Sequence, residues 1–253
     1  MSEELLTYYR QEVFPTPFCP GCGHGILMGA IVRAIHDIDM PWESMLFASG
    51  IGCGAWIPSP HYRADTLHTL HGRPVAFATG AKLFNPNLNV VVISGDGDLA
   101  AIGGNHLIHA ARRNVDMTVI CANNQIYGMT GGQVAPTSQL GDPTSTTPWG
   151  NTEPPFDLSK LVAAAGARYV ARYSVTQIHH LIKAIKNALR TKGFSFVEVL
   201  SPCPTQYGKF RGIKRTQELY HDLKSRLVTQ KAAQSMSPDE LNGKYVTGEF
   251  VVS

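Results

Sequence analysis

The stretch from residue 89 to residue 124 constrains the fold most strongly. An aliphatic run at residues 90–94 ends in Gly-Asp-Gly at 95–97, and a second apolar run at 117–122 is followed by Asn124. Each run predicts a buried strand, and glycines let the turn after the first one pass close to a ligand. Parallel strands joined by a helix end at the same edge of a sheet. Asp96 and Asn124 should meet there, where their oxygens suit Mg²⁺.

Strands and helices alternate along most of the remaining chain. Further strands are predicted at residues 45–49, 168–171 and 195–200, and helices at residues 24–38, 74–84, 99–113, 157–165 and 176–190. This alternation predicts an α/β fold with a mostly parallel sheet covered by helices on both faces. Ligands bind such sheets at the carboxyl ends of the strands, where Asp96, Asn124 and Cys203 fall.

Composition excludes several classes of protein. The 253 residues are 43% hydrophobic, which is enough for one substantial core, and no apolar stretch reaches the roughly eighteen residues of a membrane span. A formal net charge of +3 with 16% charged residues gives little support to nucleic-acid binding. The start of the chain does not resemble a signal peptide, and five cysteines are an odd number. Both favour a cytoplasmic protein without structural disulfides.

Four of the five cysteines lie in turns rich in glycine or proline: Cys19, Cys22, Cys53 and Cys203. Thiolates in such turns can point toward one centre, whereas Cys121 lies in an apolar strand and is expected in the core. Four thiolates can bind Zn²⁺ or an iron–sulfur cluster. Zinc ribbons usually contain two Cys-x-x-Cys pairs, but here two single cysteines complete one pair. An iron–sulfur cluster is therefore the favoured interpretation.

Two other segments are polar. Residues 127–155 are rich in Gly, Pro, Thr and Ser and begin beside Asn124, so we expect a functional loop rather than a simple connection. From Lys209 onward the chain is polar and contains a basic cluster of Lys209, Arg211, Lys214 and Arg215. We divide the chain into a domain at 1–208 and a C-terminal tail at 209–253 that packs on a partner subunit. Attraction of the basic cluster to an acidic electron carrier is an alternative.

Several motifs occur in order along the chain, at residues 19–24, 50–53, 68–74, 77–82, 95–114, 127–133 and 202–204. Gly-Asp-Gly followed by Asn-Asn resembles the diphosphate-binding motif of thiamine-diphosphate enzymes. Together the motifs resemble the β subunit of the 2-oxoacid:ferredoxin oxidoreductases, closest to the 2-oxoglutarate branch. The resemblance implies the diphosphate-domain fold and the conversion of a 2-oxoacid with coenzyme A into an acyl-CoA, CO₂ and reduced ferredoxin.

The resemblance also implies roles for individual residues. Mg²⁺ would take side-chain oxygens from Asp96 and Asn124 and the backbone carbonyl of Ile126. A 4Fe–4S cluster would be held by Cys19, Cys22, Cys53 and Cys203. The other residues implied around the cofactor are Gly52, His71, Gly95, Gly97, Asp98, Tyr127, Gly128, Met129 and Thr130. His71 is the catalytic candidate because it precedes a predicted helix N-terminus that can face an anion; a purely structural hydrogen bond is the alternative.

The resemblance implies that this chain has partners. Thiamine activation needs a glutamate beside the pyrimidine ring, which in the family lies on the pyrimidine-binding domain of an α subunit. The chain is therefore expected to be active only with that subunit. Small γ and ferredoxin-like δ subunits are further partners of this kind, and ferredoxin or another carrier would accept the electrons.

Trp56 bears on the choice of substrate. Relatives that act on charged or small 2-oxoacids often carry Lys or Arg at this position, three residues after Cys53. An indole instead packs against apolar groups, and Met129 adds an adaptable apolar surface. Trp56 thus favours an aryl or branched-chain 2-oxoacid, unless it only packs at a subunit contact. Because the rest of the chain most resembles the 2-oxoglutarate branch, we expect 2-oxoglutarate first and an aryl or branched-chain 2-oxoacid as the alternative.

Two further classes are weaker alternatives. A cluster-free thiamine-diphosphate decarboxylase subunit would leave the four cysteines in turns unexplained. A non-enzymatic binding module stabilised by zinc would explain the cysteines but not the pattern at residues 95–124.

Overall fold

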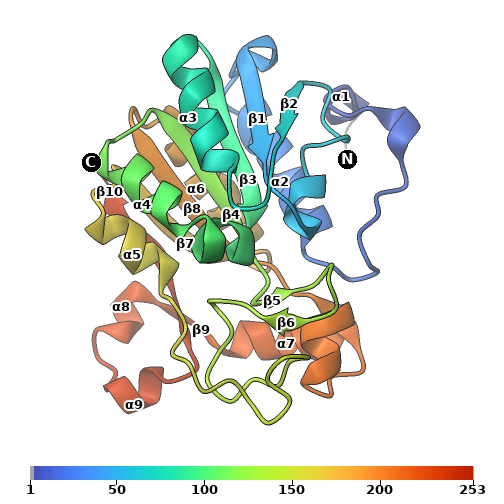
Figure 1. The fold of residues 1–253 in the computed structure, drawn as a ribbon, viewed down its shortest axis with the longest axis vertical. Helices are drawn as coiled ribbons and strands as arrows, with labels where there is room; N and C mark the ends of the chain where they lie inside the picture. The colour runs from blue at the N-terminus through green and yellow to red at the C-terminus, as the bar shows by residue number, and fades with distance from the viewer. Residues whose placement is uncertain (1–2, 253) are drawn as a thin grey trace.

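A computed structural model describes residues 3–252, and its centre is an eight-stranded sheet (Figure 1). In chain order its strands are β1 (Met45–Ser49), β2 (Asp65–His68), β3 (Asn89–Gly95), β4 (Met117–Asn123), β7 (Tyr169–Ser174), β8 (Phe194–Leu200), β9 (Leu227–Thr229) and β10 (Tyr245–Val252). They lie in the order β2-β1-β3-β4-β8-β7-β10-β9. All neighbours pair in parallel except β10 and β7, which are antiparallel. The predicted mostly parallel sheet is confirmed.

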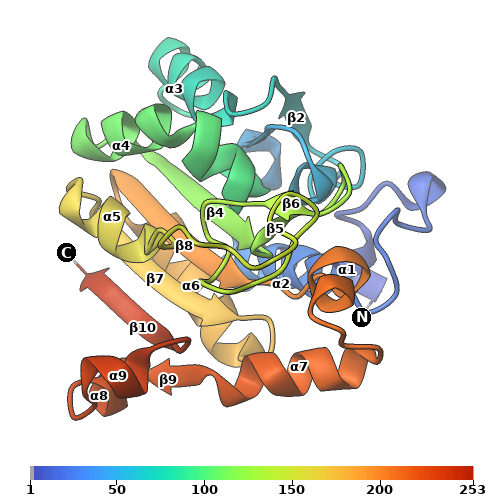
Figure 2. The same cartoon turned by 60° about the horizontal axis from the view of Figure 1, so that its bottom comes forward.

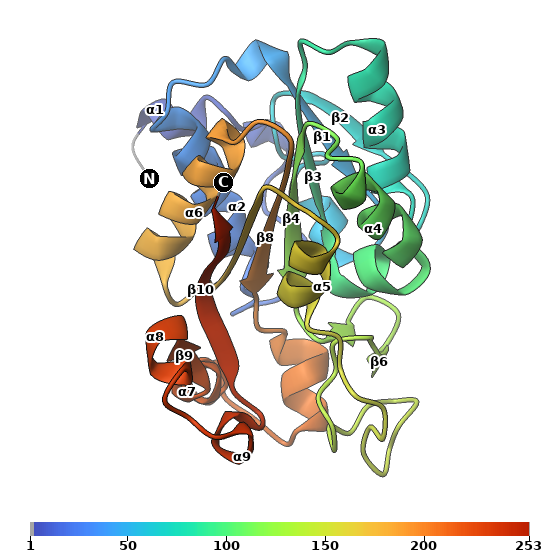
Figure 3. The same cartoon turned by 90° about the vertical axis from the view of Figure 1, so that its left-hand side faces the viewer.

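Helices cover both faces of the sheet (Figure 3). One face carries α3 (Pro74–Phe84), α4 (Gly104–Arg112) and α5 (Leu158–Ala164), and the other carries α2 (His24–His36) and α6 (Ile178–Arg190), with the short α1 (Glu3–Leu6) beside α2. Successive residues of β3 face opposite cores: Ile93 packs with the α2 side and Val92 with the α4 side. Burial on both faces explains why the strands are continuous apolar runs.

The predicted helix at residues 99–113 is interrupted in the structure. A π-helical turn, Asp98–Ile102, comes first, and α4 begins only at Gly104. Gly103 lies between them, and a Cβ there would be 2.4 Å from the carbonyl oxygen of Asp98. Such π turns often occur at functional sites. Helical periodicity alone did not reveal this break, because the apolar spacing continues through it.

The segment after residue 208 contains elements that sequence analysis did not find: α7 (Thr216–Ser225), β9, α8 (Gln230–Ala233), α9 (Pro238–Leu241) and β10. Strand β10 pairs with β7, with Glu249 opposite Ala171 and Gly248 opposite Arg172. The segment therefore contributes to the main sheet, as well as lying at the surface. Whether it also packs on a partner subunit stays a prediction.

The long loop after Asn124 folds over the carboxyl edge of the sheet (Figure 2). It contains one small antiparallel ribbon of β5 (Ile126–Tyr127) and β6 (Gln133–Val134) and is otherwise irregular up to α5. Within the described part of the chain, none of the helices combines the length and the apolar character needed to cross a membrane.

Candidate active site

A cavity of about 390 Å³ lies at the carboxyl ends of β1, β3 and β4, a size suited to a small ligand. Its lining includes all residues that the sequence implied around the cofactor: Gly52, Cys53, His71, Gly95, Asp96, Gly97, Asp98, Asn124, Ile126, Tyr127, Gly128, Met129 and Thr130. His24, Ile51, Gly54 and Gln133 complete the lining and were not selected from the sequence. The predicted set is thus brought together, although the role of each member stays a prediction.

Asp96 follows β3 and is buried at the base of this cavity. The hydroxyl of Thr137 donates to its Oδ2, and the backbone N–H of Asn124 donates to its Oδ1 over 3.4 Å. Burial raises the pKa of the Asp96 carboxyl to about 6. A bound cation would compensate for this loss of hydration. Sequence analysis missed Thr137, which lies forty-one residues along the chain with no local motif around it.

The two asparagines at the end of β4, Asn123 and Asn124, make different contacts. The side chain of Asn123 is buried and donates to Oε1 of Glu198 over 2.8 Å. Asn124 lines the cavity, and its Oδ1 accepts the backbone N–H of Ile126 over 3.2 Å. Gln125, which lies between Asn124 and Ile126, has a positive φ of 64°. This tight turn brings Asn124 and Ile126 to the cavity beside Asp96, where their oxygens can join one metal site.

Asp98 ties two loops to the end of β3. Its Oδ1 accepts the backbone N–H of Gly72 over 2.8 Å and that of Ile51 over 3.1 Å, while the hydroxyl of Ser94 donates to Oδ2 over 2.5 Å. Nδ1 of His71 also lies 2.7 Å from Oδ1. Both carboxylate oxygens are therefore engaged within the chain. Asp98 therefore fixes the positions of the two loops that carry Ile51 and Gly72 in the cavity wall. Its implied place beside the cofactor stays a prediction.

Two glycines permit the close approaches in this wall. A Cβ on Gly50 would be 1.9 Å from Oδ2 of Asp98, and a Cβ on Gly97 would be 2.4 Å from the ring of Tyr127. Real Cβ atoms do not come this close to other groups, so a side chain at either position would displace the loop or its neighbour.

Three separate segments bring four thiols together. Sγ of Cys203 and Sγ of Cys53 would lie 3.5 Å and 3.9 Å from a Cβ on Gly128. The turn with Cys19 and Cys22 joins them because the N–H of Gly23 donates to the carbonyl of Pro202 over 3.1 Å. Burial, together with the other thiols, raises the pKa of Cys22 to about 12 and that of Cys53 to about 11. Cys121 is buried in β4, as predicted.

These thiols do not form a cage for one metal ion. Among residues 3–252, no three His, Cys, Asp or Glu side chains surround a single point as ligands would. A structural zinc site needs sulfur atoms about 2.3 Å from one centre. In a 4Fe–4S cluster each cysteine binds a different iron, so its thiols stand further apart. Whether the thiols hold a cluster or zinc stays a prediction.

His24 and Trp56 occupy positions that the sequence did not predict. His24 is buried, its Nδ1 lies 2.7 Å from Oγ of Ser201, and burial lowers its pKa to about 4. Trp56 is 38% exposed and is outside the cavity lining, with its ring centroid 6.5 Å from that of His68. Met129 does line the cavity and is half exposed. Contact of Trp56 with substrate stays a prediction.

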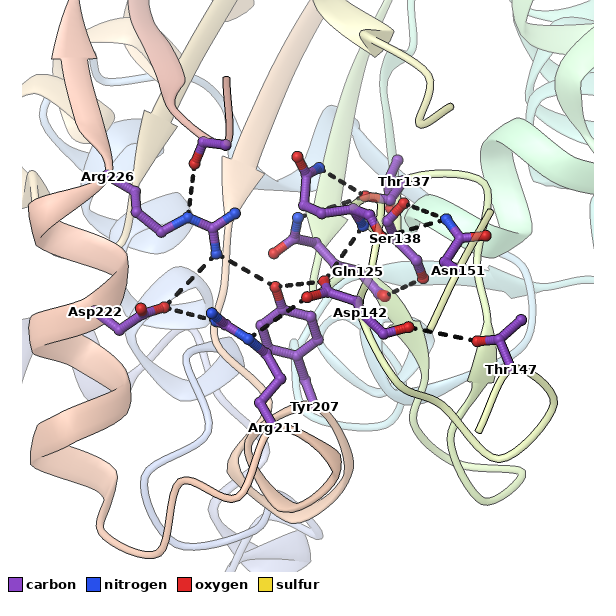
Figure 4. A network of polar contacts seen from close by, with 12 residues as sticks. Gln125, Thr137, Ser138, Asp142, Thr147, Asn151, Tyr207, Arg211, Asp222 and Arg226 are labelled. Carbon is purple, nitrogen blue, oxygen red and sulfur yellow. Dashed lines mark hydrogen bonds and ion pairs between the residues drawn. The ribbon is translucent and has the colours of Figure 1, made fainter. Parts of the chain in front are cut away.

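The long loop is connected to the C-terminal segment by buried polar side chains (Figure 4). The hydroxyl of Tyr207 donates to Oδ2 of Asp142 over 2.9 Å. Arg211, a member of the predicted basic cluster, lies 3.5 Å from the same carboxylate and 2.7 Å from Asp222. Part of that cluster is thus engaged inside the protein rather than free at the surface.

Known proteins resemble this chain in both sequence and structure. Residues 50–199 match the family described as "Thiamine pyrophosphate enzyme, C-terminal TPP binding domain". The 2-oxoglutarate synthase subunit KorB of Methanocaldococcus jannaschii is 50% identical over 97% of this chain and 91% of that protein. The 2-oxoacid:ferredoxin oxidoreductase subunit beta of Saccharolobus solfataricus is 42% identical over 74% of this chain and 62% of that protein.

A solved structure extends this similarity to the fold. The 2-oxoglutarate:ferredoxin oxidoreductase from Magnetococcus marinus, with 2-oxoglutarate, coenzyme A and succinyl-CoA bound, matches with a TM-score of 0.86 and 32% identity. The match covers 98% of this chain and 84% of that chain. The predicted fold and family are confirmed, and an enzyme subunit replaces the non-enzymatic alternative. The chain therefore belongs to the β subunits of the 2-oxoacid:ferredoxin oxidoreductases, whose thiamine-diphosphate-binding domain it carries.

Proposed function

We propose that this chain is the β subunit of an enzyme that converts 2-oxoglutarate and coenzyme A into succinyl-CoA and CO₂ and passes two electrons to ferredoxin or a similar carrier. The observation that carries the proposal is one cavity that joins the oxygen ligands Asp96 and Asn124 to the thiol of Cys53. The substrate is supported by relatives named 2-oxoglutarate synthase and by the 2-oxoglutarate bound in the similar structure.

Mg²⁺ and thiamine diphosphate would bind at the end of β3. Asp96, Asn124 and the carbonyl of Ile126 offer the hard oxygen ligands that Mg²⁺ prefers, and the diphosphate would supply others. A Cβ on Gly95 would meet no other atom within 4 Å, which leaves room for close approach of the diphosphate, while Gly97 leaves room for the ring of Tyr127. When bound, thiamine diphosphate supplies the electron sink for decarboxylation. The chain's own contribution is to hold the metal and orient the cofactor within the cavity.

A 4Fe–4S cluster held by Cys19, Cys22, Cys53 and Cys203 would remove the electrons. Cys53 lines the cavity for thiamine diphosphate, so electrons would travel only a short distance. All five cysteines are free, which fits a cytoplasmic enzyme in reducing surroundings. Burial raises the pKa of Cys22 and Cys53, so bound iron would have to compensate for the charge of the thiolates that a cluster needs.

His71 is our candidate for proton transfer. Asp98 lies beside its Nδ1, which leaves Nε2 as the ring nitrogen available to a bound molecule. The side chain is 40% exposed, so a ligand in the cavity can reach it. Asp98 would fix the orientation of the ring.

An α subunit would complete the site. No glutamate is present in the cavity lining of the described chain, so the acid that activates thiamine would come from elsewhere. Ile51, Leu70, Ile102 and Met129, all near the cavity or the loops that form it, have exposed side chains. Such an apolar surface favours cover by a partner. Small γ and δ subunits belong to the same proposal.

The decisive experiment uses the anaerobically purified complex with its α subunit. We expect 2-oxoglutarate and coenzyme A together to drive reduction of ferredoxin, and the protein to contain iron and sulfide. Asp96→Ala should abolish activity and cofactor binding, because a charged Mg²⁺ ligand disappears. Normal cofactor occupancy in Asp96→Ala, or zinc in place of iron in the parent, would refute the assignment.

The cluster ligands can be tested by iron content. We expect Cys53→Ala and Cys203→Ala to lose iron, while the matched control Cys121→Ala, in the core of β4, retains it. Full iron in Cys203→Ala would contradict the proposed four ligands.

The substrate requires its own comparison. Specificity constants for 2-oxoglutarate, pyruvate, 2-oxoisovalerate and phenylglyoxylate should rank 2-oxoglutarate first, with phenylglyoxylate and 2-oxoisovalerate representing the aryl and branched-chain alternative. The same series in Trp56→Arg tests whether Trp56 touches substrate, because an unchanged ranking would remove it from the pocket.

A further inference from the structure

Polar side chains connect the C-terminal segment to Gln125, between Asn124 and Ile126. Figure 4 shows the part of this network around Asp142, Tyr207 and Arg226. We call these residues the buttress network: Gln125, Asp142, Tyr207, Arg211, Asp222, Arg226 and Tyr245. Four of them, Gln125, Asp142, Tyr207 and Tyr245, are less than 9% exposed. Buried polar groups fix a structure when every member has a partner.

Gln125 is the point at which the buttress network reaches the candidate metal site. It lies between Asn124 and Ile126 and has a positive φ of 64°, a conformation uncommon for residues other than glycine. Its side-chain amide donates to the hydroxyl of Tyr245 and to the carbonyl of Thr137, the latter over 3.4 Å. The turn is therefore held from behind by a strand 120 residues further along the chain.

Arg226 is the centre of the buttress network. Its Nη2 donates to the hydroxyl of Tyr245 over 2.9 Å, and its Nε donates to the carbonyl of Gly243 over 2.7 Å. Nη1 reaches the hydroxyl of Tyr207 over 3.4 Å, and the guanidinium lies 4.7 Å from the ring centroid of Tyr245. A planar guanidinium can make these contacts at once, whereas a lysine ammonium on its single stem cannot.

The far side of the network reaches the long loop. Tyr207 donates to Asp142, and Arg211 pairs with both Asp142 and Asp222. Asp222 also lies 3.6 Å from Nη1 of Arg226. Two arginines thus face two aspartates, so the partly buried charges are balanced.

We propose that Arg226 is a positioning residue for the cofactor turn: through Tyr245 and Gln125 it holds Asn124 and Ile126 where they can bind Mg²⁺. The inference rests on the proposed function, since it gives these two residues their role as ligands. It assigns part of the segment at 209–253 to the cavity of its own chain. Arg226 itself touches neither metal nor substrate.

The test measures binding of thiamine diphosphate to the complex with its α subunit as Mg²⁺ is varied. Arg226→Lys retains the charge but loses the fork, and we expect the dissociation constant to rise about tenfold with iron content unchanged. Arg215→Lys is the matched control, because the side chain of Arg215 is 75% exposed and pairs with neighbouring Glu218 on α7. We expect this control to bind like the parent.

A double-mutant cycle separates positioning from general loss of stability. If Arg226 acts through Tyr245, the double variant of Arg226→Lys and Tyr245→Phe should bind no more weakly than the weaker single variant. Independent, multiplied losses would overturn the inference, as would parent-like affinity in Arg226→Lys. If Arg226→Lys does not assemble, Tyr245→Phe alone decides, because it removes one hydroxyl from a buried ring and unchanged affinity would reject the pathway.

The same titration distinguishes the two proposals. A parent complex that does not bind thiamine diphosphate with Mg²⁺ refutes the proposed function. A parent that binds it, with an Arg226→Lys variant that binds equally well, refutes only the positioning role. A fall in thermal midpoint without a change in affinity, measured well below that midpoint, would also identify Arg226 as merely structural.

Discussion

Two parts of the cavity wall are stabilised in different ways. The first wall consists of the short, glycine-rich loops bonded to the carboxylate of Asp98. The second wall is the long loop after Asn124, which is bonded to side chains near the end of the chain. In the first wall, Asp98 accepts N–H groups from Ile51 and Gly72, which are 47 and 26 residues away. In the second wall, Gln125 bonds to Tyr245, 120 residues away, and Asp142 bonds to Tyr207, 65 residues away.

This difference indicates how each wall will respond to change. The first wall depends on backbone donors that have one buried acceptor, so loss of that acceptor leaves them without a partner. The second wall is stabilised by hydrogen bonds from several side chains, so each side chain contributes a smaller part of its stability. We therefore expect a single substitution to cause a large loss of stability or affinity in the first wall and a smaller loss in the second wall.

The largest effect should come from Asp98→Ala. It leaves the N–H groups of Ile51 and Gly72 without their acceptor, and we expect a loss of about 3 kcal/mol in the free energy of unfolding together with loss of activity. Chemical denaturation and an activity assay of the complex check this. Asp98→Asn retains one acceptor oxygen and should be much less affected; equal stability of the two variants would show that Asp98 is not the anchor.

Gly97→Ala tests the place where the two walls touch. Tyr127 of the second wall donates its hydroxyl to the carbonyl of Gly97 over 3.1 Å, and a Cβ would press on its ring. Because the ring can move into the cavity, we expect affinity for thiamine diphosphate to fall about tenfold, with a smaller loss of stability. Calorimetric titration measures the affinity, and chemical denaturation measures the stability. The control is Gly80→Ala, in α3 with open space around it, which should bind thiamine diphosphate like the parent. Unchanged affinity in Gly97→Ala would show that the two walls are not in contact.

The second wall should also control how Mg²⁺ binding depends on pH. In the proposed site Mg²⁺ would bind the carboxylate form of Asp96, whose pKa burial raises to about 6. The affinity for Mg²⁺ should therefore be level above that pH and fall up to about tenfold per pH unit below it. The Thr137 hydroxyl lowers this pKa, so Thr137→Val should raise it further and move the fall to higher pH. Titrations of Mg²⁺ between pH 5 and 8 give the profile. A flat profile in the parent would contradict the role of Asp96.

Tyr207→Phe should have the smallest effect of the four. It removes one donor to Asp142 and should cost about 1 kcal/mol of stability, because other members of the buttress network remain. We expect amide hydrogen exchange to become faster around Asp142 and to stay unchanged near Ile51. Tyr220→Phe, on α7 outside the network, is the control. Equal acceleration in both walls would show that the walls are coupled rather than separate.

The two walls also differ in how far the sequence predicted them. Residues of the first wall follow strand ends directly, and Gly-Asp-Gly with its flanking apolar run is visible within ten residues. Thr137, Arg226 and Tyr245 in the second wall occur in no recognisable pattern. Thr137 hydrogen-bonds Asp96 and Tyr245 hydrogen-bonds Gln125 across long separations, and Arg226 hydrogen-bonds Tyr245.

The cysteines lie between these cases. Their residue type and their turns predicted that Cys19, Cys22, Cys53 and Cys203 could meet. The backbone bond from Gly23 to Pro202, which brings two of the segments together, has no signal in the sequence. For Trp56 the sequence predicted a place in the substrate pocket that the cavity lining does not include, although Cys53, three residues earlier, does line the cavity.

The sequence by itself determined the alternation of strands and helices, the positions of Asp96 and Asn124 at strand ends, and the family. Each of these depends on neighbours within a few residues, through hydrophobic period and turn chemistry. Only the tertiary structure decided that β10 joins the sheet antiparallel to β7, that Thr137 reaches Asp96, and that Tyr245 joins Arg226 to Gln125. These arrangements depend on distant polar groups satisfying one another as the chain packs, which no short stretch of sequence encodes.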